Sequence, residues 1–281
     1  MKQTLKDLTR KSVFLSMMLL ACSGIFAKSK TKWAVNPELP MSVRMCLSEI
    51  IRNPEGWMLD FSTKLKWNYC HGLECQAFLD VYDRYGGDYL YKYVKQFADT
   101  MINENGRIYG YKKTNYNLDH VNSGKILFRL YEREKDPRYK IAMDTLRAQL
   151  ASQPRTSDGG FWHKKIYPYQ MWLDGIYMGS PFYAQYAATF NEPEDFADVV
   201  SQFLIIAKHT YDKKTGLYRH AWDEIKALPW SDLKTGQAPH VWGRALGWYM
   251  MAIVDALDFI PENQPGRDKM ILILNDLVKI L

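Results

Sequence analysis

Four segments that begin at a glycine and continue with an apolar helical pattern recur along this chain of 281 residues. Their glycines are Gly72, Gly124, Gly175 and Gly247, and the steps between them are 52, 51 and 72 residues. A period near fifty residues is typical of stacked units that contain two helices each. The longer third step predicts an insertion. Equivalent positions in such repeats lie on neighbouring helices, so residues one repeat apart are expected to meet.

Helical periodicity dominates the chain, and Gly, Pro and Asn mark the ends of its segments. The predicted helices span residues 40–51, 72–85, 89–102, 124–134, 138–153, 180–190, 195–210, 244–259 and 267–281. They form one leading helix and four pairs, each with an inner helix, a short turn and an outer helix. The inner helices are expected to start near Gly72, Gly124, Gly175 and Arg244. Only short β segments are expected, so the sequence predicts an all-α toroid of helical hairpins.

Three long loops connect these pairs and contain most of the aromatic, histidine and glycine residues that fit no helical stripe. They span residues 108–117, 156–172 and 216–242. Aromatic residues make up 14% of the chain, with 9 Trp and 19 Tyr. Core packing explains much of this content, and a carbohydrate site lined by rings is the alternative. Long loops at one end of a helical scaffold are where such a site is expected.

The formal net charge of +6 is concentrated at the N-terminus, because residues 1–30 carry six basic residues against Asp7 alone. The remainder offers no basic patch for nucleic acid. The basic residues precede the apolar run 13–21, which is too short for a membrane span and is typical of an export signal. The end of this run resembles a bacterial lipoprotein box, which predicts a lipid anchor at Cys22. Cleavage after Ala27 is the alternative.

We therefore expect an export signal over residues 1–27 and a single helical domain over residues 33–281. The protein would be exported, either to the periplasm or as a lipid-anchored protein at the outer membrane. Cys46, Cys70 and Cys75 do not form a disulfide framework. No His or Cys cluster has the spacing of metal ligands, so no metal is expected.

Motifs in and after the long loops carry a resemblance to a known family. In order, they are Asn117-Leu-Asp119, Gly159-Gly-Phe-Trp-His163-Lys-Lys, Met171-Trp-Leu-Asp174-Gly and Trp242-Gly-Arg244. Together they resemble the unsaturated rhamnogalacturonyl hydrolases of glycoside hydrolase family 105. The related unsaturated glucuronyl hydrolases of family 88 are the second-best match. The resemblance extends from about Trp67 to the end of the chain.

The resemblance implies an (α/α)6 toroid of six helical hairpins. This chain has the length for only about four and a half such units, so the toroid is expected to be C-terminally incomplete and to expose apolar edges. The family removes an unsaturated galacturonyl residue from the non-reducing end of pectin fragments that a lyase has cut, without a cofactor. It does so by hydrating the C4=C5 vinyl ether, after which the hemiketal opens and releases the sugar.

The resemblance also assigns site residues. Asp174 would donate the proton to the alkene carbon and handle the incoming water, and Asp119 would lie nearby and hold sugar hydroxyls. Walls formed by Trp172 and Trp242 would raise the pKa of Asp174 through desolvation. Arg244 suits the substrate carboxylate, because a guanidinium can bind one bidentately. The remaining candidates for substrate contacts are His163, His220 and Trp248.

Each assignment has a simpler structural alternative. Asp119 or Asp174 could cap a helix. The two histidines could bind backbone groups in their loops, Arg244 could pair with a core carboxylate, and the spacing of Trp248 favours a core position. At the level of the whole protein, the alternatives are an unsaturated glucuronyl hydrolase acting on glycosaminoglycan fragments and a non-catalytic glycan-binding protein. A helical scaffold that binds protein partners suits the loop rings and acids less well.

Overall fold

The structure is a computed structural model that describes residues 35–280. The predicted export signal, with Cys22 and Ala27, lies outside the described residues. The chain divides into two units, residues 1–39 and 40–281. Of the first, the described residues 35–39 contain a turn closed by a hydrogen bond from Leu39 N to Asn36 O. Across the part of the chain that is described, no helix combines the length and the apolar character needed to cross a bilayer.

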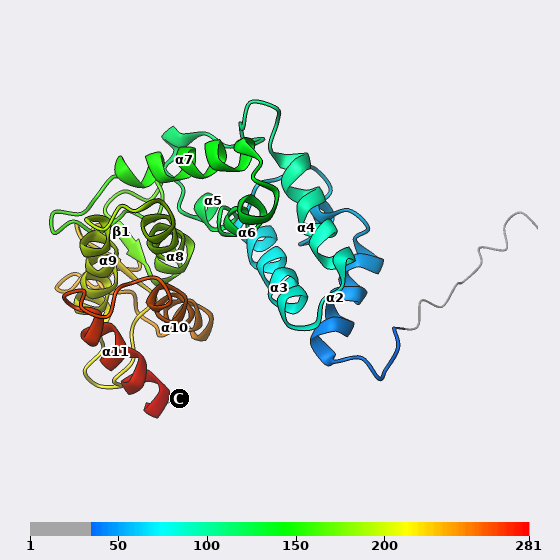
Figure 1. Cartoon of the computed structure of the whole chain (residues 1–281). Helices are drawn as coiled ribbons and strands as arrows, with labels where there is room; N and C mark the ends of the chain where they lie inside the picture. The colour runs from blue at the N-terminus through cyan, green and yellow to red at the C-terminus, as the bar shows by residue number, and fades with distance from the viewer. Residues whose placement is uncertain (1–34, 281) are drawn as a thin grey trace, which may run out of the picture. The chain divides into compact units, whose positions relative to one another are not determined.

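The described part of the second unit contains a leading helix followed by four helical hairpins. The leading helix is α2 (Met41–Arg52), and the hairpins are α3 (Tyr69–Tyr85) with α4 (Asp88–Met101), α5 (Asp119–Asn122) and α6 (Lys125–Glu134) with α7 (Pro137–Ala151), α8 (Leu173–Phe190) with α9 (Asp195–Thr210), and α10 (Gly243–Leu257) with α11 (Arg267–Ile280). In Figure 1, α3, α6, α8 and α10 are the inner helices, and α4, α7 and α9 lie outside them. The predicted all-α arrangement of hairpins is confirmed.

Glycines determine how closely the successive hairpins approach one another. A Cβ atom on Gly72 of α3 would lie 2.5 Å from the Cα atom of Ser123. A Cβ atom on Gly124 would lie 2.4 Å from Leu146 Cδ1 and 2.8 Å from Phe182 Cε2. No side chain larger than hydrogen fits at either contact without displacement of its neighbours. Two of the glycines that define the sequence repeat therefore lie at contacts between hairpins.

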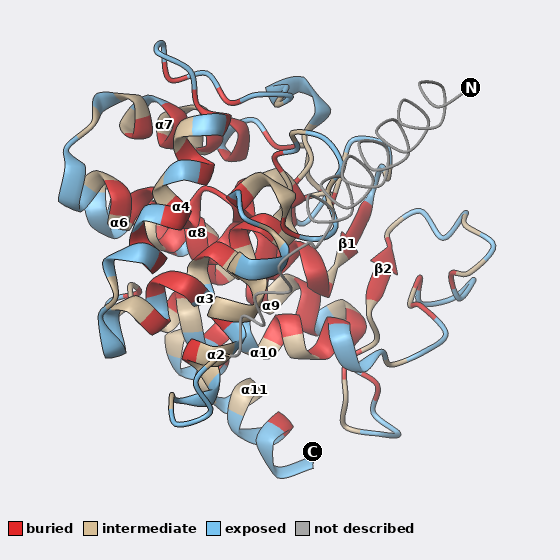
Figure 2. Ribbon diagram, turned by 90° about the vertical axis from the view of Figure 1, so that its right-hand side faces the viewer, coloured by how far each residue is buried: buried red, intermediate tan, exposed pale blue. Residues whose placement is uncertain are grey.

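The third inner helix begins earlier than its predicted span of 180–190. It starts at Leu173, two residues before Gly175, and Pro181 lies inside it. A Ser-Pro pair favours a helix start because proline is well tolerated in the first turn, whereas inside a helix it costs about 3 kcal/mol. Every residue from Leu173 to Pro181 is buried, as the colours of Figure 2 show for α8. Packing on all sides of α8 offsets the cost of the proline.

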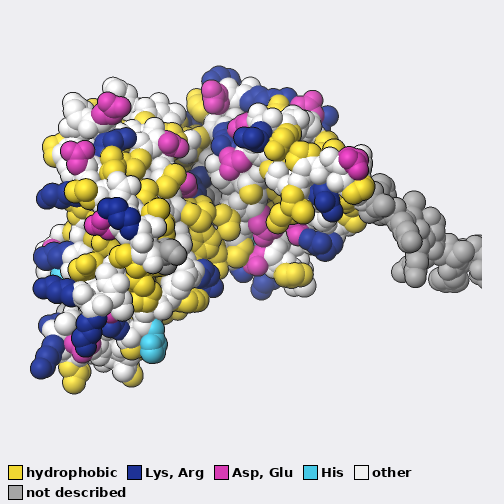
Figure 3. Space-filling view, turned by 90° about the horizontal axis from the view of Figure 1, so that it is seen from below, with side chains coloured by type: hydrophobic (Ala, Val, Ile, Leu, Met, Phe, Trp, Pro, Cys, Tyr) yellow, Lys and Arg dark blue, Asp and Glu magenta, His cyan; other side chains and the backbone are white. Residues whose placement is uncertain are grey.

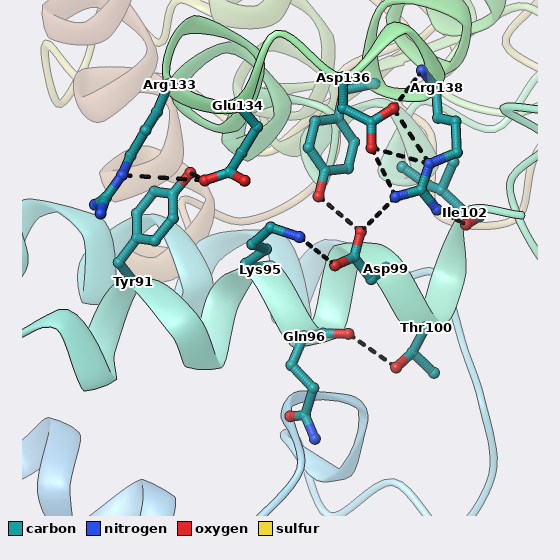
Figure 4. Close-up of polar contacts among 11 residues, drawn as sticks. Tyr91, Lys95, Gln96, Asp99, Thr100, Ile102, Arg133, Glu134, Asp136 and Arg138 are labelled. Carbon is teal, nitrogen blue, oxygen red and sulfur yellow. Dashed lines mark hydrogen bonds and ion pairs between the residues drawn. The ribbon is translucent and has the colours of Figure 1, made fainter. Parts of the chain in front are cut away.

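A polar network joins α4 to the start of α7 (Figure 4). The Asp136 carboxylate caps α7 by accepting a hydrogen bond of 2.9 Å from Arg138 N, and it also pairs with Arg138 Nη2 at 2.7 Å. The same guanidinium lies 2.9 Å from Asp99 Oδ1, which accepts a hydrogen bond of 2.8 Å from Tyr139 Oη. Charge-assisted bonds of this kind fix direction as well as distance. They hold the second hairpin against the first.

The surface includes hydrophobic side chains on the last described hairpin. Met251 and Val254 of α10 are exposed, as are Leu272 and Val278 of α11. From below (Figure 3), hydrophobic side chains share the surface with side chains of both charge signs.

A two-stranded antiparallel ladder ties two of the long loops together. β1 (Gln170–Trp172) pairs with β2 (Ala221–Asp223), and Trp172 lies opposite Ala221. β1 leads directly into α8, where Leu173 N donates a hydrogen bond of 2.9 Å to His220 O. The ladder is one of the short β segments that the sequence predicts. It places His220 beside the first turn of α8.

Candidate active site

Asp174 lies in the first turn of α8, directly after β1. Its side chain is buried, and its Oδ2 atom has no hydrogen-bond partner among the described residues. Arg244 Nη2 lies 3.9 Å from Oδ1. Burial raises the pKa of Asp174, the charge of Asp119 adds to the rise, and the charges of Arg244 and His220 oppose it. A carboxyl group that desolvation favours in its protonated form can serve as a proton donor.

Helix capping does not account for either aspartate. The N-cap residue of α8 is Trp172 and that of α5 is Leu118, and neither helix has a side-chain hydrogen bond at its cap. Asp174 is the second residue of its helix and Asp119 the first. Both therefore remain candidates for a role in chemistry.

Asp119 occupies a different environment from Asp174, although both are buried. Lys164 Nζ lies 2.5 Å from its Oδ2 atom, and His163 Nε2 lies 3.4 Å from its Oδ1 atom. Lys164 belongs to one of the sequence motifs, but its spacing alone indicated no partner. One carboxyl group is thus paired directly with an ammonium group, while the other has an unpartnered oxygen. Two carboxyl groups in such different surroundings are suited to different roles.

His163 is buried beside Asp119, and this burial lowers its pKa to about 4, although the Asp119 charge opposes the shift. The imidazole is therefore neutral at neutral pH. Its ring stacks on Trp172, with centroids 4.7 Å apart. A Cβ atom at position 175 would lie 2.8 Å from His163 Nδ1. The glycine at this position therefore leaves room for the imidazole ring.

The tryptophans differ in how much ring surface they expose. His163 and Tyr167 both stack on Trp172, which limits the ring area left for a sugar. Trp242 is 42% exposed, and the Cζ atom of Arg244 lies 3.9 Å from its ring centroid. Trp248 is 9% exposed, and its ring lies 4.6 Å from that of Tyr177. Trp242 is thus the most accessible of the three, and Trp248 has the core position that its spacing favours.

Arg244 and His220 follow Asp174 in the sequence, whereas Asp119 and His163 precede it. The Arg244 side chain is 54% exposed, and Asp174 is the carboxylate nearest to it among the described ion pairs. The buried carboxylate with which Arg244 pairs is thus that of Asp174 itself. His220 Nδ1 lies 3.3 Å from His240 O, and its ring meets the edge of Trp242 at 6.0 Å.

Tyr69 lies close enough to Arg244 and Asp119 for their charges to act on its hydroxyl group, and the sequence reasoning did not single it out. Burial raises its pKa to about 12, and the charges of Arg244 and Asp119 also act on it. It is the first residue of α3, whereas the prediction began this helix at Gly72. Tyr69, Asp119, Asp174 and Arg244 are each the first or second residue of α3, α5, α8 or α10. The repeat itself is the signal that could have identified Tyr69.

The described residues contain no group of three or more His, Cys, Asp or Glu side chains that could hold a metal ion. What the site does contain is a desolvated carboxyl group, a second carboxyl group paired with lysine, an exposed arginine and an exposed indole ring. Helix N-termini add partial positive charge, which favours an anionic ligand group at α8 and α10.

The arrangement of helical hairpins, with Asp119 and Asp174 at the starts of α5 and α8, defines a protein of the helical-toroid fold class. The chain belongs to glycosyl hydrolase family 88, whose family model matches residues 41–281.

Relatives support this assignment. A solved glycoside hydrolase of family 105 from C. acetobutylicum ATCC 824 is 41% identical, with a TM-score of 0.81, over 86% of this chain and 66% of its own. The unsaturated rhamnogalacturonyl hydrolase YesR of Bacillus subtilis is 23% identical over 73% of this chain and 58% of its own length. An unsaturated glucuronyl hydrolase from Bacillus sp. GL1 shares the fold at 13% identity, with a TM-score of 0.60, over 85% of this chain and 67% of its own.

The fold is therefore the helical toroid of families 88 and 105, as predicted. The chain spans 66% of the solved family 105 relative and 58% of the curated rhamnogalacturonyl hydrolase.

Proposed function

We propose that the protein is a glycosidase that removes unsaturated galacturonyl residues from the non-reducing ends of lyase-generated pectin oligosaccharides. The observation that supports this most strongly is the Asp174 side chain, which is buried, has an unpartnered oxygen and lies 3.9 Å from Arg244. A proton donor beside a cation matches a substrate whose reactive double bond is conjugated to a carboxylate.

In the proposed reaction, the carboxyl group of Asp174 donates its proton to C4 of the substrate double bond. Positive charge then develops at C5, where the ring oxygen shares it. Water adds to C5 and gives up a proton to the Asp174 carboxylate, which regenerates the acid. The hemiketal formed at C5 opens to a ketone, and the former anomeric carbon becomes an aldehyde as the remaining saccharide leaves. No carboxylate separation rule for ordinary glycoside hydrolysis applies, because the first step is hydration.

The other residues have roles that follow from their surroundings. Arg244 would bind the substrate carboxylate, because its guanidinium is exposed and faces Asp174. Trp242 offers an exposed ring for the apolar face of a sugar. Asp119, held by Lys164, would accept hydrogen bonds from sugar hydroxyls. His163 would hold Asp119 in position, and Trp172 would hold the His163 ring by stacking on it. His220 would contribute a polar contact to the substrate.

An unsaturated glucuronyl hydrolase acting on glycosaminoglycan fragments is the second candidate, and the match to the family 88 model favours it. The two can be separated by the loss of ultraviolet absorbance of the conjugated double bond. We expect faster loss with a lyase-generated rhamnogalacturonan disaccharide than with an unsaturated glycosaminoglycan disaccharide. A saturated disaccharide serves as the control and should remain intact. Binding without loss of absorbance for either substrate would favour a non-catalytic glycan-binding protein.

Replacing Arg244 with alanine should raise KM about 10- to 100-fold and change kcat little. Removal of a hydrogen bond to a charged group costs roughly 1.5–3 kcal/mol, and the substrate carboxylate is present in both the ground state and the transition state. Steady-state kinetics measure this effect. Arg84→Ala is the matched control, because that arginine is exposed and its side chain donates a hydrogen bond to the neighbouring Tyr85. An unchanged KM in Arg244→Ala would remove Arg244 from substrate binding.

The pH profile provides an independent measurement. Because Asp174 would act in its protonated form, kcat/KM should fall as the pH rises through its pKa, which burial places above the ordinary value of 3.8. The Arg244 charge opposes that rise. Arg244→Ala should therefore raise the pKa further and move the falling limb to higher pH. A limb that stays in place or moves to lower pH would contradict the proposed proximity of these two charges.

A further inference from the structure

Lysines gather at the Asp119 side of the candidate active site. Residues 61–68, 108–117 and 161–169, which precede α3, α5 and α8, contain six lysines and no Asp or Glu. Among the described residues, the lysine ion pair of these segments is that of Lys164 with Asp119. Four of the exposed lysines are here called the lysine cluster: Lys66, Lys112, Lys113 and Lys165.

Backbone hydrogen bonds hold two of these segments side by side. Leu118 N donates a hydrogen bond of 3.1 Å to His163 O, and Lys165 N donates one of 3.4 Å to Asn115 O. Asn115 is the last residue of η2 (Lys113–Asn115), a short 3-10 helix. The cluster lysines of both segments are therefore held on neighbouring stretches of backbone, next to the pair that Lys164 forms with Asp119.

The third segment meets the other two at His120, the residue after Asp119. Trp67 Nε1 donates a hydrogen bond of 2.7 Å to His120 O, which fixes the loop that contains Lys66. Burial lowers the pKa of the His120 imidazole, the Asp119 charge opposes this, and the charges of Lys164 and Lys66 lower it further. Lysines from separate loops thus act on one imidazole. No basic run in the sequence reveals them, because the three loops lie far apart along the chain.

Ammonium groups that gather without carboxylates repel one another, and an anion between them offsets the repulsion. Arg244 is already assigned to the carboxylate of the unsaturated residue, which has only one. We propose that the lysine cluster binds a second anionic group of the same oligosaccharide, the carboxylate of a further uronic acid in the part that leaves. This inference rests on the proposed function and extends it beyond the terminal sugar.

The ligand class is therefore an unsaturated oligosaccharide that carries at least two carboxylates. A rhamnogalacturonan disaccharide carries one, and the tetrasaccharide, whose third sugar is a second galacturonate, carries two. The KM of the wild type should be lower for the tetrasaccharide than for the disaccharide. The difference should shrink as salt is added, because exposed charges are screened over about 10 Å at 0.1 M ionic strength. A tetrasaccharide advantage that does not respond to salt would contradict the role of charge.

The double variant Lys112→Gln/Lys113→Gln tests the cluster directly. The ratio of the tetrasaccharide KM to the disaccharide KM should rise about 3- to 10-fold, because each exposed ion pair is worth at most about fivefold in affinity. Lys213→Gln/Lys214→Gln is the matched control, with the same change in net charge. Both of its lysines are exposed in the turn after α9, where a Cβ atom on Gly216 would lie 2.8 Å from Ile280 of α11. An unchanged ratio, or equal changes in both double variants, would overturn the proposal.

Equilibrium binding separates a failure of this proposal from a failure of the glycosidase activity. Calorimetric titration with a saturated tetrasaccharide of the same composition needs no turnover, and its Kd should rise in Lys112→Gln/Lys113→Gln but not in the control. That result would support the cluster even if the wild type cleaved neither unsaturated substrate. A sulfated unsaturated glycosaminoglycan disaccharide offers a sulfate ester as the alternative anion. If the cluster variant weakened binding of this ligand and left the tetrasaccharide unaffected, the assignment to a uronic acid carboxylate would be wrong.

Discussion

Asp174→Asn should lower kcat about 10³-fold, with little change in KM, on unsaturated disaccharides. The amide has nearly the same shape as the carboxyl group, so the contacts that bind substrate are kept. It cannot donate a carboxylic proton to C4, which is the step that starts the proposed hydration. The measurement is steady-state kinetics that follow the loss of absorbance of the conjugated double bond.

Two further variants make this result specific. Asp119→Asn should have an intermediate effect, because it weakens sugar contacts and the pairing with Lys164 and also removes a charge that raises the pKa of Asp174. Asp276→Asn is the control, since Asp276 is exposed on α11 and its ion pair among the described residues is with Lys279 on the same helix. A folded Asp174→Asn protein with a kcat near that of the wild type would remove Asp174 from the acid role.

The fold could be predicted largely from local patterns, because most helices show their own apolar period, and α2, α3 and α8 end at asparagine or glycine. The exceptions lie where packing overrides those local signals. α8 extends back to Leu173 because its whole first half is buried, and no period marks a helix that is covered on every side. Similarly, α3 begins at Tyr69, three residues before the glycine that defines the repeat.

The candidate site was predictable where the repeat and the motifs coincide. Asp119 and Asp174 are the first and second residues of α5 and α8, and His163 lies 3.4 Å from Asp119. The pairing of Lys164 with Asp119 could not be predicted, because a loop between two helices has no period that fixes which side chain turns inward. The position of His220 depends on the β1–β2 register, which three residues of alternating pattern do not specify.

The sequence repeat determines where the candidate site residues lie. The candidate site takes Tyr69, Asp119, Asp174 and Arg244 from the first turns of α3, α5, α8 and α10, which is one residue from each hairpin. Asp119 depends on this arrangement directly, because α5 ends next to Ser123, the residue that packs against Gly72 of the preceding inner helix. The geometry of the site is therefore linked to close packing between hairpins.

Gly72→Ala should for this reason destabilise the protein by about 3 kcal/mol, because overpacking of a close contact costs this order of free energy. The added Cβ atom would lie 2.5 Å from Ser123 Cα and 2.8 Å from Ser123 N. Backbone atoms cannot turn away as a flexible side chain can, so α3 and α5 must separate. Denaturant unfolding followed by circular dichroism measures the change in the free energy of unfolding.

Gly247→Ala is the matched control, because Gly247 is the repeat glycine of α10 and an added Cβ atom there meets nothing within 4 Å. Alanine is favoured over glycine inside a helix by about 1 kcal/mol, so this variant should be slightly more stable than the wild type. The two substitutions are chemically identical, and both glycines lie inside inner helices. Opposite shifts of the unfolding midpoint would therefore isolate the contact with Ser123, whereas equal shifts would show that this contact does not control how the inner helices pack.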